Sequence, residues 1–216
     1  MSRMEKIMNE IVEKRNEILA EKIIKGLESR NMTGYYAKNK EEALKKALEI
    51  IPIKSKVTNG GSMTLKEIGL IDALDKGDYD YCNRETVSDR REAERFAFEA
   101  DFFLGSSNAI TEDGVLINID GNSNRISAYA YGPAHVLLVI GMNKVAPDID
   151  SAMKRARNTA APINAMRFGK KTPCTLNGSC MNCKSPDTIC CQFLITRYSR
   201  HKDRIHVILV GENLGF

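Results

Sequence analysis

The fold is decided by the stretch Ser55–Leu74, which reads SKVTNGGSMTLKEIGLIDAL. Its first residues are typical of a short strand that ends near Thr58, and two consecutive glycines then permit a tight turn. Apolar residues recur after the turn at three- and four-residue steps, which indicates a helix. Thr64 and Glu67 have the spacing of a capping box, so the helix is predicted to begin there.

The same alternation of strand and helix continues on both sides of this stretch. Further strands are predicted at residues 33–37, 79–83, 101–110, 114–120 and 135–141, and further helices at residues 4–30, 39–51, 88–100 and 148–161. This order predicts βαβ units, so we expect an α/β fold with a mainly parallel sheet covered by helices on both faces. Residues 191–216 are predicted to form two strands joined by a polar loop, which favours a mixed sheet edge.

The N-terminal segment forms a unit of its own in this prediction. Apolar residues recur at helical spacing from Met4 to Leu27, on a helix whose other face is charged. Such a stripe packs either on its own domain or on another subunit, for example in a homodimer. We therefore divide the chain into an amphipathic helix, residues 1–30, and an α/β domain, residues 31–216, which includes a cysteine-rich loop at 174–191.

Composition narrows the class of protein. The 216 residues are 43% hydrophobic and 28% charged, which is typical of a globular domain and argues against disorder. The net charge of +4 is spread along the chain without a basic tract, so we expect no nucleic-acid partner. No apolar run approaches the roughly 20 residues of a membrane span, and the first residues lack the apolar region of a signal peptide. The sequence thus predicts a cytoplasmic protein without membrane contact.

The glycine turn is the first candidate binding site. Gly60 and Gly61 place free backbone N–H groups at the start of a helix, and Ser62 and Thr64 add hydroxyls. Ligands of open α/β sheets bind at the carboxyl ends of strands, so a small anion is expected here. The spacing matches neither a dinucleotide fingerprint nor a P-loop, and a tight turn without a ligand is the alternative.

A second polar stretch, Gly105–Arg125, is also a candidate site. It gathers Asn108, Asn118 and Asp120 around short apolar strands. Glu112 and Asp113 are candidate acid–base residues if burial separates their pKa values, although the Glu-Asp-Gly run by itself is typical of a hairpin turn.

The densest chemical motif is Cys174–Cys191, CTLNGSCMNCKSPDTICC, which holds five of the six cysteines. In a reducing compartment such cysteines indicate metal ligands or reactive thiols before disulfides. The spacing C-x5-C-x2-C-x6-C predicts four thiolate ligands: Cys174, Cys180, Cys183 and Cys190. Cys191 is the alternative fourth ligand, because adjacent side chains diverge.

Four thiolates suit a [4Fe–4S] cluster or a tetrahedral zinc ion. A zinc ribbon usually has two C-x2-C knuckles and this loop has one, which favours the cluster. Lys170, Lys171 and Lys184 would offset the negative charge of either centre. A redox dithiol formed by Cys180 and Cys183 is the other interpretation, and the loop context disfavours it.

Three segments together resemble one known family. They are GGSMTLKEIGL, FLGSSNAITEDGVLINIDGNSNRISAYAYGPAHVLLVIGMNKV and the tail TPC…GSCMNCKSPDTIC. They are similar to the lactate-utilisation (LUD) domain family, and specifically to its stand-alone members with a C-terminal cysteine motif. The resemblance extends from about Asn39 to Phe216.

That resemblance implies a three-layer α/β/α Rossmann-like sandwich of the ribose-phosphate isomerase, glucosamine-phosphate deaminase and CoA-transferase type, with an N-terminal helix and a Cys-rich insertion. It also implies a cleft at the strand ends. Positions expected to line that cleft are Gly60, Gly61, Ser62, Glu67, Asn108, Asp113, Asn118 and Asp120. Known members take part in lactate oxidation with iron–sulfur partner proteins, but the family provides no set of catalytic residues to carry over.

Three functions follow as expectations. The first is a component of a cytoplasmic oxidoreductase system for lactate or a similar 2-hydroxy acid, with a [4Fe–4S] cluster and an iron–sulfur or flavin partner subunit. The second is an isomerase or transferase that acts on a sugar phosphate or acyl substrate and carries a structural zinc ion. The third is a non-catalytic ligand sensor.

Overall fold

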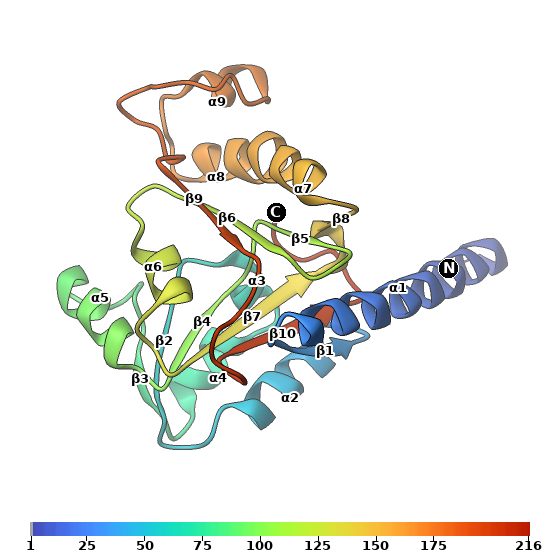
Figure 1. Ribbon diagram of the computed structural model, residues 1–216, viewed down its shortest axis with the longest axis horizontal. Coiled ribbons are helices and arrows are strands. Elements are labelled where there is room, and N and C mark those ends of the chain that lie inside the picture. Colours follow the sequence, from blue (N-terminus) through green and yellow to red (C-terminus); the bar gives the residue numbers. More distant parts are fainter. Residues whose placement is uncertain (1) are drawn as a thin grey trace.

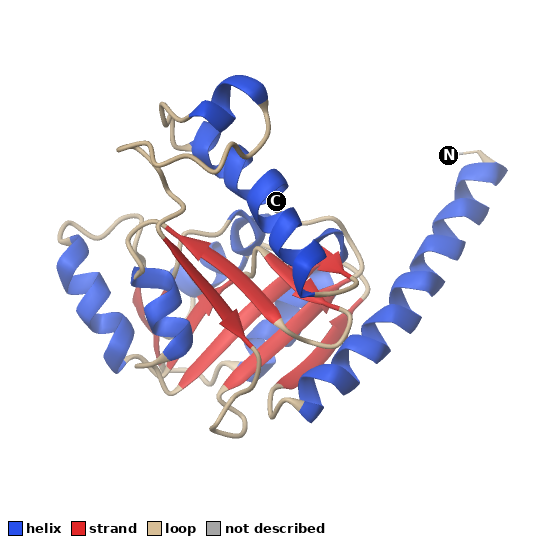
Figure 2. Ribbon diagram, turned by 45° about the horizontal axis from the view of Figure 1, so that its top comes forward, coloured by secondary structure: helices blue, strands red, loops and turns tan. Residues whose placement is uncertain are grey.

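The structure, a computed structural model that describes residues 2–216, is organised around a six-stranded parallel sheet (Figures 1 and 2). The order of its strands is β1-β10-β7-β4-β2-β3, and a second sheet has the order β8-β5-β6-β9. The strands are β1 (Thr33–Ala37), β2 (Lys56–Asn59), β3 (Asp80–Cys82), β4 (Phe102–Gly105), β5 (Ala109–Thr111), β6 (Leu116–Asp120), β7 (His135–Gly141), β8 (Val145–Ala146), β9 (Gln192–Thr196) and β10 (Ile205–Val210).

Nine α-helices occur in residues 2–216 and cover the two sheets. They are α1 (Arg3–Ser29), α2 (Lys40–Ile50), α3 (Met63–Glu67), α4 (Leu70–Lys76), α5 (Arg90–Glu99), α6 (Asn124–Ala130), α7 (Ile149–Arg155), α8 (Ala161–Arg167) and α9 (Pro173–Asn177). A 3-10 turn at Met142–Lys144 follows β7, and a π-helical segment, Ala156–Ala160, joins α7 to α8. None of these helices is both long and apolar enough to cross a membrane.

Strand β7 explains why the chain forms layers. Val136 and Leu138 point to one face of the large sheet, where they pack with α1, α5 and α6. Leu137 and Val139 point to the other face, where they pack with α2, α3 and α4. Because side chains alternate along a strand, a continuous apolar run requires cover on both faces. The expected three-layer α/β/α arrangement is confirmed.

The small sheet adds a further layer over part of the large one. Its inner residues join the core beneath α1, and its outer residues pack against α7 and the π-helical segment (Figure 2). Strands β5 and β6 form the antiparallel hairpin that the Glu-Asp-Gly run indicates.

The predicted mixed edge at the C-terminus is wrong. Strand β10 lies inside the parallel sheet, between β1 and β7, whereas β9 pairs antiparallel with β6 of the small sheet. The two strands differ in character, because β10 is buried on both faces and β9 is exposed at alternate positions. A two-faced apolar strand belongs in the centre of a parallel sheet.

Two predicted helix boundaries also change. The N-cap of α3 is Ser62, whose hydroxyl accepts a hydrogen bond from Leu65 N at 3.4 Å, and Gly69 in the left-handed conformation separates α3 from α4. Pro162 does not end its helix, because the π-helical turn immediately before α8 absorbs the break in the hydrogen-bond pattern.

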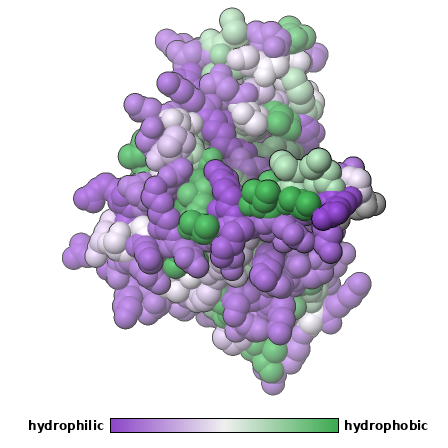
Figure 3. All heavy atoms as spheres, turned by 90° about the vertical axis from the view of Figure 1, so that its right-hand side faces the viewer, coloured by the Kyte–Doolittle hydropathy of each residue, from purple (hydrophilic) through white to green (hydrophobic). Residues whose placement is uncertain are grey.

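The long helix α1 is only partly packed. Ala20, Ile23 and Leu27 are fully buried in the core. The first half of the helix projects from the molecule (Figures 1 and 2), and its apolar residues are exposed, among them Met8 and Ile11. Figure 3 views the molecule from the side on which this end projects and shows hydrophobic side chains grouped there among hydrophilic ones. Pairing of this stripe with a second subunit stays a prediction.

Gly26 lets α1 approach the hairpin between β5 and β6. A Cβ atom at this position would lie 2.5 Å from the backbone carbonyl of Asp113. We predict that Gly26→Ala lowers the free energy of unfolding by about 1–3 kcal/mol, because overpacking outweighs the higher helix propensity of alanine.

Urea unfolding followed by circular dichroism measures this change. Lys25→Ala, at an exposed position of the same helix, is the matched control and should be neutral or slightly stabilising. Equal or greater stability of Gly26→Ala would show that α1 does not pack closely on the hairpin.

Candidate functional site

A pocket of about 460 Å³ lies where the carboxyl ends of β2 and β4 meet the small sheet and α8. This volume is in the range of small-molecule sites. Its basic residues are Arg84, Arg90, Arg125, Lys144, Arg167 and Lys170, and its acidic side chain is Asp120. We call it the cationic pocket. The excess of basic groups provides a field that attracts anions.

The glycine turn supplies one side of this pocket. Gly61, Ser62 and Thr64 line it, as predicted. Gly60 lies next to the pocket, where a Cβ atom would come within 3.0 Å of Arg125 Cγ, so its missing side chain leaves room for the arginine. Helix α3 is only five residues long, so the pocket depends on these side chains and on the basic groups more than on a helix terminus.

Arg125 is the most connected residue of the site. Its guanidinium donates hydrogen bonds to Asn118 Oδ1 at 2.8 Å and to the Ile119 carbonyl at 2.6 Å. It also donates to Asn108 Oδ1 at 3.3 Å, and its Nε lies 3.5 Å from Asp120 Oδ2. The predicted residues Asn108 and Asp120 therefore line the pocket, and the buried Asn118 supports Arg125 from beneath.

Glu67 contributes indirectly. Its carboxylate accepts a hydrogen bond from Gly215 N at 2.7 Å, which fixes the C-terminal residues beside the pocket. Gly215 and Phe216 line the pocket as a result.

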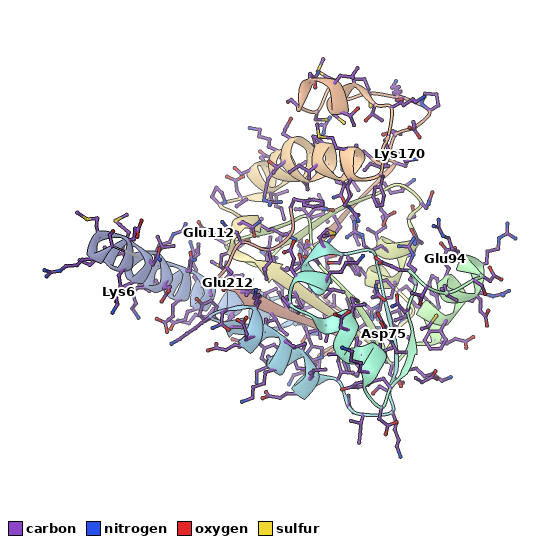
Figure 4. All side chains as sticks on the ribbon, turned by 180° about the vertical axis from the view of Figure 1, so that it is seen from behind. Lys6, Asp75, Glu94, Glu112, Lys170 and Glu212 are labelled. Atoms are coloured by element: carbon purple, nitrogen blue, oxygen red, sulfur yellow. The ribbon has the colours of Figure 1, made fainter. Side chains whose placement is uncertain are left out.

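Glu112 and Asp113 lie elsewhere, on the hairpin turn between β5 and β6. Lys22 Nζ of α1 binds Glu112 Oε2 at 2.6 Å, and Arg30 binds the Asp113 carboxylate. Hydrogen bonds from Thr111 and Arg30 keep the pKa of Asp113 below its usual range. Figure 4 shows Glu112 well apart from Lys170, which lines the pocket. The structure thus gives both carboxylates the role of attaching α1 to the hairpin.

Three pocket arginines have no carboxylate partner in residues 2–216. Arg84 and Arg90 make no hydrogen bond or ion pair there, and Arg167 donates only to the neutral amide of Asn164, at 3.0 and 3.3 Å. The guanidinium of Arg167 also stacks on Phe168, 4.1 Å from the ring centre. These groups are available to an anion.

Lys144 is the least expected residue of the site. It ends the 3-10 turn after β7 and is only 2% exposed. Its Nζ donates to Thr64 Oγ1 at 2.9 Å and to Ser106 Oγ at 3.0 Å. Burial, followed by repulsion from Arg155, lowers the pKa of this amine from 10.5 to about 7. In the sequence, only the position of Lys144, three residues after the most apolar predicted strand, could have indicated that it belongs to the site.

The cysteine loop, residues 174–191, adjoins the same pocket. Ile189 and Cys190 line it. Burial, and after it the thiols of Cys180, Cys174 and Cys183, raise the pKa of Cys190 to about 11. The predicted ligands therefore lie near one another, although no three His, Cys, Asp or Glu side chains of residues 2–216 are placed close enough to hold a metal ion.

Two charged side chains near the cysteine loop, Arg157 and Lys170, also contact it. Arg157 Nη2 donates a hydrogen bond to Cys180 Sγ at 3.5 Å and thereby places a basic group beside the loop. Lys170 Nζ lies 3.0 Å from Asp187 Oδ1, so part of the basic charge expected beside the loop is balanced by a carboxylate of the loop. Cys191 is exposed, and its thiol donates a hydrogen bond to the Thr188 carbonyl at 3.8 Å.

Together, the parallel sheet, its strand-end pocket and the excess of basic side chains in that pocket define an α/β/α protein with a basic pocket at the strand ends. The chain belongs to the LUD domain family, whose model matches residues 20–210. This family is linked to lactate utilisation.

Among solved structures, the chain is similar to the crystal structure of a DUF162 family protein from Deinococcus radiodurans. The two are 13% identical, with a TM-score of 0.53, and the match covers 90% of this chain and 98% of that one. This similarity establishes the fold. No curated protein matches the chain.

Lys144 should give the stability of the protein a distinct pH dependence. Between about pH 7 and 10.5 the unfolded chain holds a proton on this amine and the folded protein does not. Stability therefore rises with pH across that window, with this residue contributing about 1.4 kcal/mol per pH unit. Lys144→Met should remove that contribution. The free energy of unfolding of the variant should therefore rise less with pH than that of the wild type.

Urea unfolding at several pH values from 7 to 9.5 tests this. Lys45→Met removes an exposed lysine of α2 and should follow the wild-type dependence. Parallel curves for wild type and Lys144→Met would contradict the lowered pKa.

Proposed function

We propose that this protein binds a small carboxylate in the cationic pocket and works in a system that oxidises lactate or a similar 2-hydroxy acid in the cytoplasm. The observation that carries the proposal is the position of Cys190, which lies at the edge of the anion site and within the cysteine loop. Membership of the LUD domain family supports the same substrate class.

The chain's own residues divide the work of binding. Arg167 and Arg84 are free to form charge-assisted hydrogen bonds to a carboxylate, which are stronger than neutral ones. Ser62 and Asn108 offer neutral donors and acceptors for a hydroxyl group. Asp120 accepts backbone hydrogen bonds from Asn122 and Ser123 at 3.0 Å, which fix the turn after β6 that lines the pocket.

We further propose that Cys174, Cys180, Cys183 and Cys190 hold a [4Fe–4S] cluster. The all-sulfur donor set, the C-x2-C turn and the hydrogen bond from Arg157 to Cys180 support this, and the side chains would have to move together to bind it. When bound, the cluster would accept or donate single electrons. Conversion of a 2-hydroxy acid to a 2-oxo acid releases two electrons and two protons, so a flavin or iron–sulfur partner subunit is also required.

An isomerase or transferase with a structural zinc ion is the second candidate. The three arginines without carboxylate partners favour it, because a phosphate dianion matches their charge better than one carboxylate does. Proton transfer would then fall to Asp120, the acidic side chain of the pocket, and not to Glu112 or Asp113. Binding of ribose 5-phosphate but not of lactate or pyruvate would support this candidate, and binding without turnover would support a sensor.

The anion site is tested by removing one free guanidinium. We predict that Arg167→Gln weakens lactate or pyruvate binding by about tenfold or more, because a charge-assisted hydrogen bond contributes about 1.5–3 kcal/mol. Isothermal titration calorimetry measures the change.

Arg95→Gln serves as the matched control for net charge, since Arg95 is exposed on α5 and does not line the pocket. Equal affinities for the two variants would place the anion elsewhere. No binding of either acid to the wild type would overturn the carboxylate site itself.

The metal centre is tested by anaerobic purification. We predict a brown protein with iron and sulfide in equal amounts, and loss of both in Cys180→Ser and Cys183→Ser. Cys82→Ser is the control, because Cys82 lies on β3 outside the loop. Cys190→Ser should lose the cluster and Cys191→Ser should keep it. A colourless protein with stoichiometric zinc would exclude the electron-transfer role.

A further inference from the structure

Lys144 is a buried lysine of the cationic pocket whose amine has only neutral hydrogen-bond partners. Its side chain enters the cationic pocket from the 3-10 turn behind β7, and its amine is held by the hydroxyls of Thr64 and Ser106. Both partners are neutral, and no carboxylate of residues 2–216 forms an ion pair with it. A buried lysine without a carboxylate partner is costly to keep charged.

The surrounding charges increase that cost. Arg155 and Arg125 repel a proton on Nζ, and the one nearby carboxylate that favours the proton, Glu67, accepts a hydrogen bond from Gly215 N. Arg155 is itself fixed by its hydrogen bond to the Asn143 carbonyl at 2.9 Å. With the pKa lowered to about 7, a large share of the amine carries a free electron pair at neutral pH.

We propose that Lys144 is a nucleophile that binds a 2-oxo acid covalently, as an imine, in the cationic pocket. This rests on the proposed function, because a 2-oxo acid is the oxidation product of a 2-hydroxy acid. The pocket offers both groups that such a compound requires: arginines for its carboxylate and an amine for the adjacent carbonyl carbon.

The step balances without an oxidant or reductant. The Nζ electron pair attacks the carbonyl carbon, a C–N bond forms and the carbonyl oxygen becomes a hydroxyl group. Both protons of the attacking amine pass to that oxygen, which leaves as water, and a C=N bond remains. Thr64 and Ser106 touch Nζ and can both donate and accept, so their hydroxyls can carry these protons.

Reductive trapping tests the proposal. The full chain is incubated with pyruvate and sodium cyanoborohydride, which converts an imine to a stable secondary amine, and the modified lysine is located by peptide mass spectrometry. We expect modification of Lys144 about tenfold or more above that of any exposed lysine, since the pocket holds the carbonyl beside the amine. Lactate, which has no keto group, should give no modification.

Lys170 is the internal control, because it lines the same pocket but pairs with Asp187 and should stay unmodified. Lys144→Met and Lys144→Arg should both abolish trapping, and the arginine variant keeps N–H donors for the hydroxyls of Thr64 and Ser106 if the methionine variant folds poorly. The contrast between pyruvate and lactate in the wild type needs no variant.

The outcomes separate this inference from the function on which it rests. Pyruvate binding in a thermal-shift assay without modification of Lys144 would overturn the imine and leave the anion site standing. Modification spread evenly over exposed lysines would also overturn it. Absence of any pyruvate binding would overturn the inference and the carboxylate site together.

Discussion

The guanidinium of Arg125 is the interaction on which the site depends. From α6 it reaches the loop after β4, through the Ser106 carbonyl at 3.3 Å, and strand β6, through the Asn118 side chain at 2.8 Å. It thereby joins the large sheet to the small one at the point where the pocket opens. A planar group with five donors can satisfy several acceptors at once, which a lysine cannot do. Gly60 is part of the same constraint, because a Cβ atom there would contact the Arg125 side chain at 3.0 Å and require it to shift.

The two sheets determine which loops and helices surround the pocket. The parallel sheet brings the loops after β2 and β4 to one edge, and the small sheet carries α7 and α8 across it (Figure 1). Strand β9 follows the cysteine loop and pairs with β6, with Gln192 opposite Asp120. This pairing, together with the hydrogen bond from Cys191 N to the Asp120 carbonyl at 3.0 Å, brings the loop to the pocket. An insertion that looks separate in the sequence is thus attached to the site by main-chain contacts.

The sequence predicted the features of the fold that depend on a local pattern of residues. The alternation of strands and helices predicted the layers, and the helix predicted at residues 39–51 begins with Asn39 as its N-cap, whose Oδ1 accepts a hydrogen bond from Glu42 N at 2.9 Å. The features that it did not predict depend on contacts between residues that lie far apart in the chain. The strands that pair with β9 and β10 lie far from them in the chain, and Arg84, Lys144 and Arg167 become neighbours only through the fold. Glu112 and Asp113 show the reverse case, because two adjacent acids suggest catalysis until their partners on α1 are known.

The charge of the pocket argues for a ligand more strongly than its shape does. The four arginines of the pocket face a single acidic side chain and repel each other, and burial of Lys144 adds a desolvation cost, so the arrangement weakens the fold when no anion is bound. Natural proteins keep such destabilising features mainly where function requires them. A bound anion would relieve both costs, and its binding free energy would add to stability by mass action. The pocket is therefore better explained as a site formed for negative charge than as a gap between two sheets.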